Sequence, residues 1–443
     1  MAQHLPTSTS TSTSTERTER ALAAIEAAGD EGRRIFTRVY AEAALQAAQA
    51  ADQRAASGIS LGPLDGRIVS IKDLLDVAGE PTTAGSAVLR QAAPAQRDAL
   101  VVQRLRAAGA VLIGKTNMTE FAFSGIGINP HYGTPGNAHD ATRIPGGSSC
   151  GAGVSVVHGM AEIAIGTDTG GSIRIPAALA GIAGFKPTQA RVPRTGALAL
   201  SYTLDTIGPL AASVQDCAQA DAVLAGQPWQ ALPARQLAGL RVGVPRGALL
   251  ADADAPVLAA FEQALARLSG AGVRLVDMAL DDWLLAPARL QQAGSLAAAE
   301  AAHIHRERLE RAPEQLDPRV LARIRPGQDV AAAHYVGLLQ ARSRLQAELD
   351  AQLQDVDLLA LPTLPILPPR IADLLADDAA FMRANALMLR NPSVFNFYDL
   401  PALSLPMGRM ASAGGLPFGL MLVGQRQCDR QLLALAAALQ ALL

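Results

Sequence analysis

Short apolar runs alternate with amphipathic stretches along most of the chain. Apolar runs of strand length are separated by stretches in which apolar residues recur at the spacing of a helix. Strands that alternate with helices predict an α/β fold, in which one large mixed β-sheet is covered by helices on both faces. The expected strands are 67–71, 110–113, 162–165, 240–244, 273–276, 356–361, 402–405 and 418–423, and the expected helices are 97–109, 151–160, 256–269 and a last one from about 430.

The N-terminal part of the chain has a different pattern. Residues 6–15 form a Ser/Thr tract with nothing to bury, so residues 1–18 are predicted to be a disordered tail. Residues 19–60 are rich in alanine and predict a helical segment. The rest shows no internal repeat and keeps one α/β rhythm, so residues 61–443 are expected to form a single large domain.

Composition and charge exclude several classes of protein. Of 443 residues, 49 % are hydrophobic and only 18 % are charged, which predicts a large buried core. The net charge is −2 with no basic block, so no nucleic-acid partner is expected. No apolar run reaches the ~18 residues of a membrane span, and no signal peptide is recognisable. A cytoplasmic protein without a membrane partner is therefore expected. The three cysteines are scattered and have neither disulfide nor zinc spacing.

Lysine is unusually rare in this sequence. Of the 38 basic residues only Lys72, Lys115 and Lys186 are lysines, which leaves 35 arginines. Arginine stays protonated in proteins, whereas a buried lysine can lose its proton. The three lysines are therefore candidates for positions that arginine could not fill.

Two short motifs match known expressions but lack the right surroundings. Residues 109–116 (GAVLIGKT) fit the phosphate-binding P-loop expression, yet a helix precedes them and their apolar centre is typical of a buried strand. Residues 147–151 (GSSCG) fit the nucleophile elbow of an α/β-hydrolase at Ser149, yet a loop rather than a strand precedes them. The required histidine would be His303, His305 or His334, and all three lie in helical sequence that favours surface or packing roles.

A third constellation requires no histidine. Ser172 follows two glycines, which allow the amides of Thr169, Gly170, Gly171 and Ser172 to point at one oxyanion. A serine nucleophile needs a base, and a desolvated lysine can supply one. Lys72 lies at the end of an apolar strand, where burial would lower its pKa from ~10.4 to about 7–8. Ser148 would relay the proton between them.

These segments resemble the signature of the amidase signature family. The likeness rests on residues 143–153 (RIPGGSSCGAG), 165–176 (IGTDTGGSIRIP) and 184–188 (GFKPT). It extends to 70–79 (SIKDLLDVAG), 81–86 (PTTAGS), 114–122 (GKTNMTEFA), 401–406 (PALSLP) and 415–419 (GLPFG). The likeness runs from about residue 60 to 440 and is loosest in the middle of the chain.

The resemblance implies a Ser–cis-Ser–Lys triad. Ser172 would be the nucleophile, Ser148 the bridging serine after a cis peptide bond, and Lys72 the base. The amides of Thr169, Gly170 and Gly171 would form the oxyanion hole.

The resemblance also implies supporting residues and a reaction. Asp168 and Arg174 would hold the loop, and the enzyme would use neither metal nor organic cofactor. Cys150 departs from the family pattern, which generally has Gly or Ser there. The implied activity is hydrolysis of a small carboxylic amide, and a homodimer is compatible with it.

Three activities stay open at this point. Residues 291–305 (QQAGSLAAAEAAHIH) are similar to free-standing amidases, which places a stand-alone enzyme first. The first alternative is the glutaminase subunit of a tRNA-dependent amidotransferase. The second is a serine esterase of the α/β-hydrolase type that uses Ser149.

Overall fold

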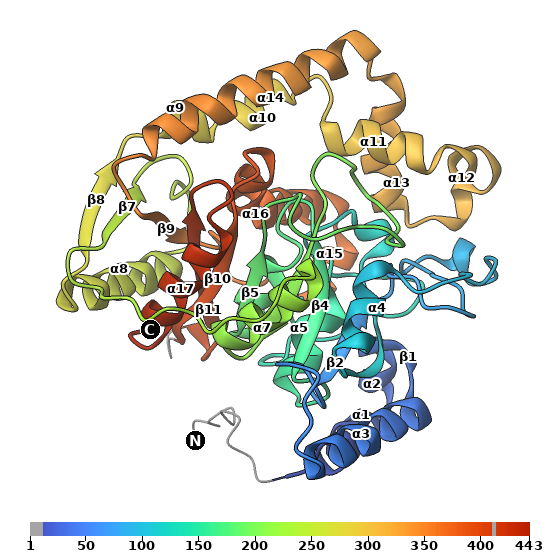
Figure 1. The fold of residues 1–443 in the computed structure, drawn as a ribbon. Helices are drawn as coiled ribbons and strands as arrows, with labels where there is room; N and C mark the ends of the chain where they lie inside the picture. The colour runs from blue at the N-terminus through green and yellow to red at the C-terminus, as the bar shows by residue number, and fades with distance from the viewer. Residues whose placement is uncertain (1–11, 410–412) are drawn as a thin grey trace.

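One mixed sheet of eleven strands runs through the molecule. The computed structural model describes residues 12–409 and 413–443, and its strands follow the order β1-β3-β2-β4-β6-β5-β10-β11-β9-β7-β8 (Figure 1). Strands β2, β3 and β4 are parallel, as are β7, β8 and β9, and antiparallel strands join the two groups. The predicted fold class, a single large mixed sheet with helices around it, is confirmed.

The described elements have the following bounds. The strands are β1 (Phe36–Val39), β2 (Ile68–Lys72), β3 (Val111–Thr116), β4 (Ile163–Asp168), β5 (Ala183–Lys186), β6 (Thr206–Ala211), β7 (Arg241–Pro245), β8 (Arg274–Met278), β9 (Leu358–Pro362), β10 (Ala402–Arg409) and β11 (Pro417–Gly424). The α-helices are α1 (Ser14–Ala27), α2 (Asp30–Ile35), α3 (Ala41–Ala56), α4 (Leu100–Ala107), α5 (Cys150–Val157), α6 (Arg174–Ala180), α7 (Val214–Ala225), α8 (Ala255–Gly270), α9 (Asp281–Leu284), α10 (Ala286–Leu290), α11 (Leu296–Ile304), α12 (Arg306–Arg311), α13 (Pro318–Ile324), α14 (Ala332–Gln352), α15 (Ile371–Ala376), α16 (Asp378–Phe397) and α17 (Asp429–Gln440). Short 3-10 helices are η1 (Ala87–Leu89), η2 (Glu120–Ala122), η3 (Pro313–Gln315) and η4 (Arg325–Asp329).

Every predicted strand is present, and three further strands were missed. Strand β1 lies in the N-terminal segment that was predicted to be helical, where it pairs antiparallel with β3. Strands β5 and β6 join β4 to β10 in the sheet, and each contains glycine, while β6 also contains Pro209. Glycine and proline lower intrinsic strand preference, so here the pairing with neighbouring strands decides the structure.

The predicted tail is wrong over residues 14–18, because α1 begins at Ser14. The hydroxyl of Thr13 accepts from the amide of Glu16, and the Glu16 carboxylate accepts from the Thr13 amide, which is a capping box. The amides of Ser14 and Thr15 donate to Asp52 in α3 at 2.6 Å and 3.0 Å. Residues 1–11 of the predicted tail lie outside the described residues.

Two features of the arrangement matter for the site. The parallel strands β2, β3 and β4 have their carboxyl ends at the same end of the sheet. Their last residues, Lys72, Thr116 and Asp168, therefore lie close together. Helices α9 to α14 lie together beyond the sheet, at the top of Figure 1. Within the described ranges, no helix combines the length and the apolar character needed to cross a membrane.

Candidate active site

Lys72 ends β2 and is completely buried. Its Nζ donates to Ser148 Oγ at 2.7 Å and to Thr167 Oγ1 at 2.9 Å. Burial lowers the pKa of Lys72 to about 7, and the negative charges of Asp205 and Asp168 only partly oppose this. A lysine with such a pKa is partly neutral at pH 7 and can accept a proton.

Ser148 lies in the loop before α5, and the peptide bond that precedes it is cis, as the resemblance implies. Its carbonyl accepts from the Thr119 amide at 3.0 Å, and the amide of Gly147 donates to the Gly125 carbonyl at 2.8 Å. A Cβ atom on Gly147 would lie 2.6 Å from the Gly127 nitrogen. The loop is therefore held by backbone contacts too close for any residue but glycine at 147.

Ser172 lines a large cavity, which we call the substrate cavity. Its volume is about 790 Å³, and Thr169 and Gly170 line it beside Ser172. The Ser172 carbonyl accepts from the Ser149 amide at 3.3 Å, which holds the two serine-bearing segments side by side. Among the described residues, no hydrogen bond joins Ser172 Oγ to Ser148 Oγ. The structure thus contains the predicted contact between Lys72 and Ser148, but not the second contact of the relay.

Asp168 organises the loop that carries Ser172. Its Oδ1 accepts from the Gly171 amide at 2.7 Å, from Arg174 Nη2 at 2.9 Å and from Asn396 Nδ2 at 2.8 Å. Its Oδ2 accepts from the Ile173 amide at 3.2 Å and from Arg174 Nε at 3.0 Å. Burial alone would raise the pKa of Asp168, but the charge and hydrogen bonds of Arg174 hold it below its usual range. Asp168 is therefore a carboxylate, and its hydrogen bonds tie the Gly171 and Ile173 amides to Arg174.

One of the three amides predicted to form an oxyanion hole is already paired. The amide of Gly171 already donates to Asp168, so it is not free to bind an oxyanion. Among the described residues, no acceptor pairs with the amides of Thr169, Gly170 or Ser172. Gly171 has φ +130°, and a Cβ atom there would lie 2.6 Å from Pro392 Cγ. This glycine shapes the loop, while its neighbours present the free amides.

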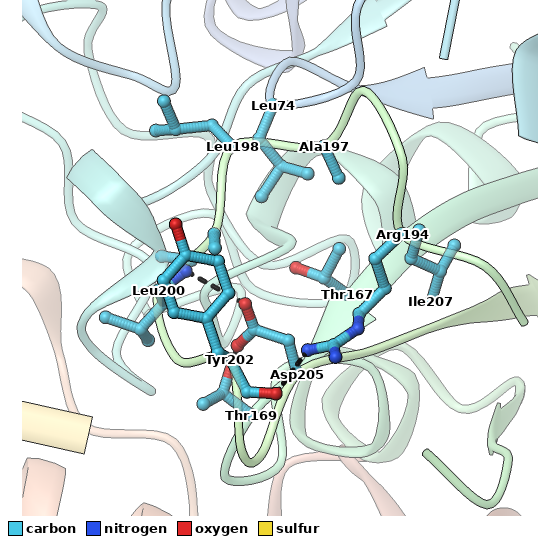
Figure 2. A pocket seen from close by; sticks show the side chains of 12 residues that line it. Leu74, Thr167, Thr169, Arg194, Ala197, Leu198, Leu200, Tyr202, Asp205 and Ile207 are labelled. Atoms are coloured by element: carbon cyan, nitrogen blue, oxygen red, sulfur yellow. Dashed lines mark hydrogen bonds between the residues drawn. The ribbon is translucent and has the colours of Figure 1, made fainter. Parts of the chain in front are cut away.

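A second, smaller cavity of about 120 Å³ shares Thr169 and Leu200 with the wall of the substrate cavity (Figure 2). Its wall includes Thr167, which contacts Lys72, and Thr169, whose hydroxyl donates to Asp205 at 2.6 Å. Burial raises the pKa of Asp205, although hydrogen bonds to its carboxylate oppose this. Arg194 lines the same cavity and donates to the Tyr202 carbonyl at 2.7 Å.

Known proteins resemble this chain over most of its length. Residues 16–433 match the Amidase family. The chain belongs to the amidase family. It is 39 % identical over 407 residues to 2-amino-5-chloromuconic acid deaminase of Comamonas testosteroni, an alignment that covers 90 % of this chain and 86 % of that protein.

Two further relatives widen the range of reactions in the family. The chain is 36 % identical over 462 residues to the A subunit of glutamyl-tRNA(Gln) amidotransferase from Chloroflexus aurantiacus, covering 96 % of this chain and 93 % of that protein. A crystal structure of an amidase superposes with a TM-score of 0.86 at 33 % identity, covering 97 % of this chain and 96 % of that chain. The likeness therefore extends over the whole fold.

The surroundings of the P-loop match and of the nucleophile-elbow match do not form the sites that these two motifs usually form. Residues 111–116 of the P-loop match form β3, whose ladder with β1 and β2 occupies its backbone. Ser149 is completely buried, and its hydroxyl donates to the Thr167 carbonyl at 3.4 Å. No histidine in the described ranges forms a hydrogen bond with Ser149. His305, the buried one, stacks on Phe121 with ring centroids 4.0 Å apart.

All three lysines of this amidase are buried, as their rarity suggested. Lys115 pairs with Asp73 at 3.4 Å, and the Nζ of Lys186 donates to the Pro187 carbonyl at 2.8 Å. Cys150, the departure from the family pattern, is also buried, and burial raises the pKa of its thiol to about 12. The Cys150 thiol is therefore protonated and carries no negative charge that could form an ion pair with Lys72.

Sequence reasoning missed two residues that support the site. Thr167 contacts Lys72. The sequence could have indicated this residue, because Thr167 directly precedes Asp168 at the polar end of a strand. Asn396 donates to Asp168 and accepts from Arg174 Nη2 at 2.6 Å. It lies more than 200 residues away in α16, and nothing in the local sequence marks it.

Proposed function

We propose that this protein hydrolyses a small carboxylic amide to a carboxylate and ammonia or an amine through an acyl-enzyme on Ser172. The observation that carries the proposal is the buried contact of 2.7 Å between Lys72 Nζ and Ser148 Oγ, beside a serine that opens on a large cavity. In addition, the relatives include a deaminase and an amidase. The expected location is the cytoplasm.

In the proposed mechanism, Ser172 Oγ attacks the carbonyl carbon while its proton passes through Ser148 to neutral Lys72. The amides of Thr169 and Gly170 bind the resulting oxyanion, and each such donor is worth roughly 10²–10³ in rate. Collapse breaks the C–N bond, and the leaving nitrogen takes the proton back from Lys72 through Ser148. Water then attacks the acyl group by the same route and releases the carboxylate and free Ser172.

Covalent labelling tests the nucleophile. A fluorophosphonate should form an adduct that peptide mapping locates at Ser172, because an activated serine beside free amides traps such reagents. Ser172→Ala should abolish labelling and Ser149→Ala should preserve it. An adduct on Ser149 would contradict the proposal and favour an esterase of the α/β-hydrolase type.

A glutaminase subunit is the second candidate, favoured by the identity to the A subunits of amidotransferases. Ammonia release from a panel of aliphatic, aromatic and dicarboxylic amides separates the two. A stand-alone amidase should hydrolyse at least one of them as the purified chain, without ATP. Turnover that appears only with ATP and partner proteins would support the glutaminase instead.

A further inference from the structure

Arg323 in α13 lines the substrate cavity together with Ser172. Its Nε is shielded from solvent and has no hydrogen-bond acceptor. Within residues 12–409 and 413–443, no carboxylate forms an ion pair with Arg323. The guanidinium lies over the ring of Phe123, another residue of the cavity wall, with its carbon 4.6 Å from the ring centroid.

Among the described residues, Arg323 differs from other partly buried arginines because its guanidinium forms no hydrogen bond. Arg104 and Arg342 lack a carboxylate partner but donate to backbone carbonyls. Arg174 pairs with Asp168 at 2.9 Å, Arg191 pairs with Asp221 at 2.6 Å, and Arg67 pairs with two carboxylates. Burying a cation without a partner is costly, so buried charges are normally paired. Burial lowers the pKa of Arg323 to about 10, at which the guanidinium is still protonated at pH 7.

The wall of the substrate cavity is positively charged overall. It contains two arginines, Arg323 and Arg390, and its described residues include neither aspartate nor glutamate. Arg390 donates to the carbonyls of Ala251 and Leu249 at 2.7 Å and 3.0 Å, so neutral acceptors occupy its donors while its charge persists. Arg323 is the one of the two whose donors are free to bind a ligand.

We propose that Arg323 binds a carboxylate of the substrate, which makes the substrate class an amide that also carries a carboxylate. The planar guanidinium matches a carboxylate with parallel hydrogen bonds, and the absence of acidic residues removes competition. Leu387, Leu389 and Val394 line the same cavity, so its wall offers apolar contacts to the hydrocarbon part of such a substrate. This inference rests on the proposed hydrolysis at Ser172.

Paired substrates test the assignment. The probes are the monoamides of succinic, glutaric and adipic acids, each compared with its neutral diamide by the kcat/KM for ammonia release. The best monoamide should exceed its diamide by roughly 10²-fold, the range of charge-assisted hydrogen bonds. Arg323→Met should reduce that ratio to below about threefold, and Arg323→Lys should retain part of it. Arg325→Met, which removes an exposed arginine two residues away, should keep the full ratio.

Two results would overturn the assignment: a ratio near one in the unaltered protein, or a ratio that survives Arg323→Met. If Arg323→Met does not fold, competition in the unaltered protein decides. Glutarate should protect Ser172 from fluorophosphonate at a concentration at least about tenfold lower than glutaramide, and equal protection would refute the role of Arg323. Failure of labelling, or of hydrolysis of every amide, would instead reject the proposed function.

Discussion

Replacing Lys72 by methionine or by arginine is expected to lower turnover strongly in both cases but to change stability in opposite directions. Lowering the pKa of a lysine from 10.5 to about 7 corresponds to about 5 kcal/mol, because one pKa unit is worth about 1.4 kcal/mol. Methionine removes this cost and loses the hydrogen bonds to Ser148 and Thr167, which are worth about 1–1.5 kcal/mol each. We therefore expect Lys72→Met to stabilise the fold by about 2 kcal/mol.

Arginine cannot lose its proton and would bury a charge without a carboxylate partner. Lys72→Arg should thus destabilise the fold by about 3–5 kcal/mol.

The stability of the unaltered protein should also depend on pH, because Lys72 is protonated to different extents in the folded and unfolded chain. Between pH 7 and 10.5 the unfolded chain holds a proton on Lys72 that the folded chain lacks, so this group makes stability rise with pH over that window. Lys72→Met should lose this contribution.

The assay combines thermal unfolding at pH 6, 7 and 9 with ammonia release. Both variants should lose roughly 10²–10⁴ in kcat, the usual worth of positioned proton transfer. Lys186→Met serves as a matched control, because it removes another buried lysine whose pKa burial also lowers but whose Nζ donates to a backbone carbonyl rather than to Ser148 or Thr167. An active and stable Lys72→Arg variant would refute the reasoning, since it would show that a permanent cation suffices at this position.

Three further outcomes are expected. Ser148→Ala should keep the fold by circular dichroism but lose roughly 10²–10⁴ in turnover, and near-normal turnover would remove Ser148 from the mechanism. The kcat/KM should rise with pH through about 7, as Lys72 loses its proton, and a flat profile from pH 5 to 8 would contradict a lysine base. Gly171→Ala should lower the melting temperature, because its φ is +130° and Pro392 leaves no space, whereas Gly170→Ala meets only ordinary contacts and should not.

The triad could be proposed from the sequence because its parts lie at the ends of recognisable elements. Lys72 ends an apolar strand, and Ser172 follows a strand end and two glycines. Since the parallel strands β2 and β4 are neighbours, their carboxyl ends lie together, and the side chains of Lys72 and Thr167 meet there. The helix and strand pattern was also sufficient for the fold class. Strands β5 and β6 were missed because their pairing, rather than their composition, makes them strands.

The chemistry of the loop and the cavity depends on contacts that no local pattern contains. The Gly171 amide looked equivalent to its neighbours in the sequence, but Asp168 occupies it, and Asp168 is in turn held by Asn396 from α16. Arg323 is one of 35 arginines, and only its position in the cavity wall without a carboxylate distinguishes it. Strand ends therefore specify where we propose that the reaction takes place. Asn396 of α16 supports the carboxylate that occupies the Gly171 amide, and Arg323 of α13 sets the charge that the proposed substrate would meet.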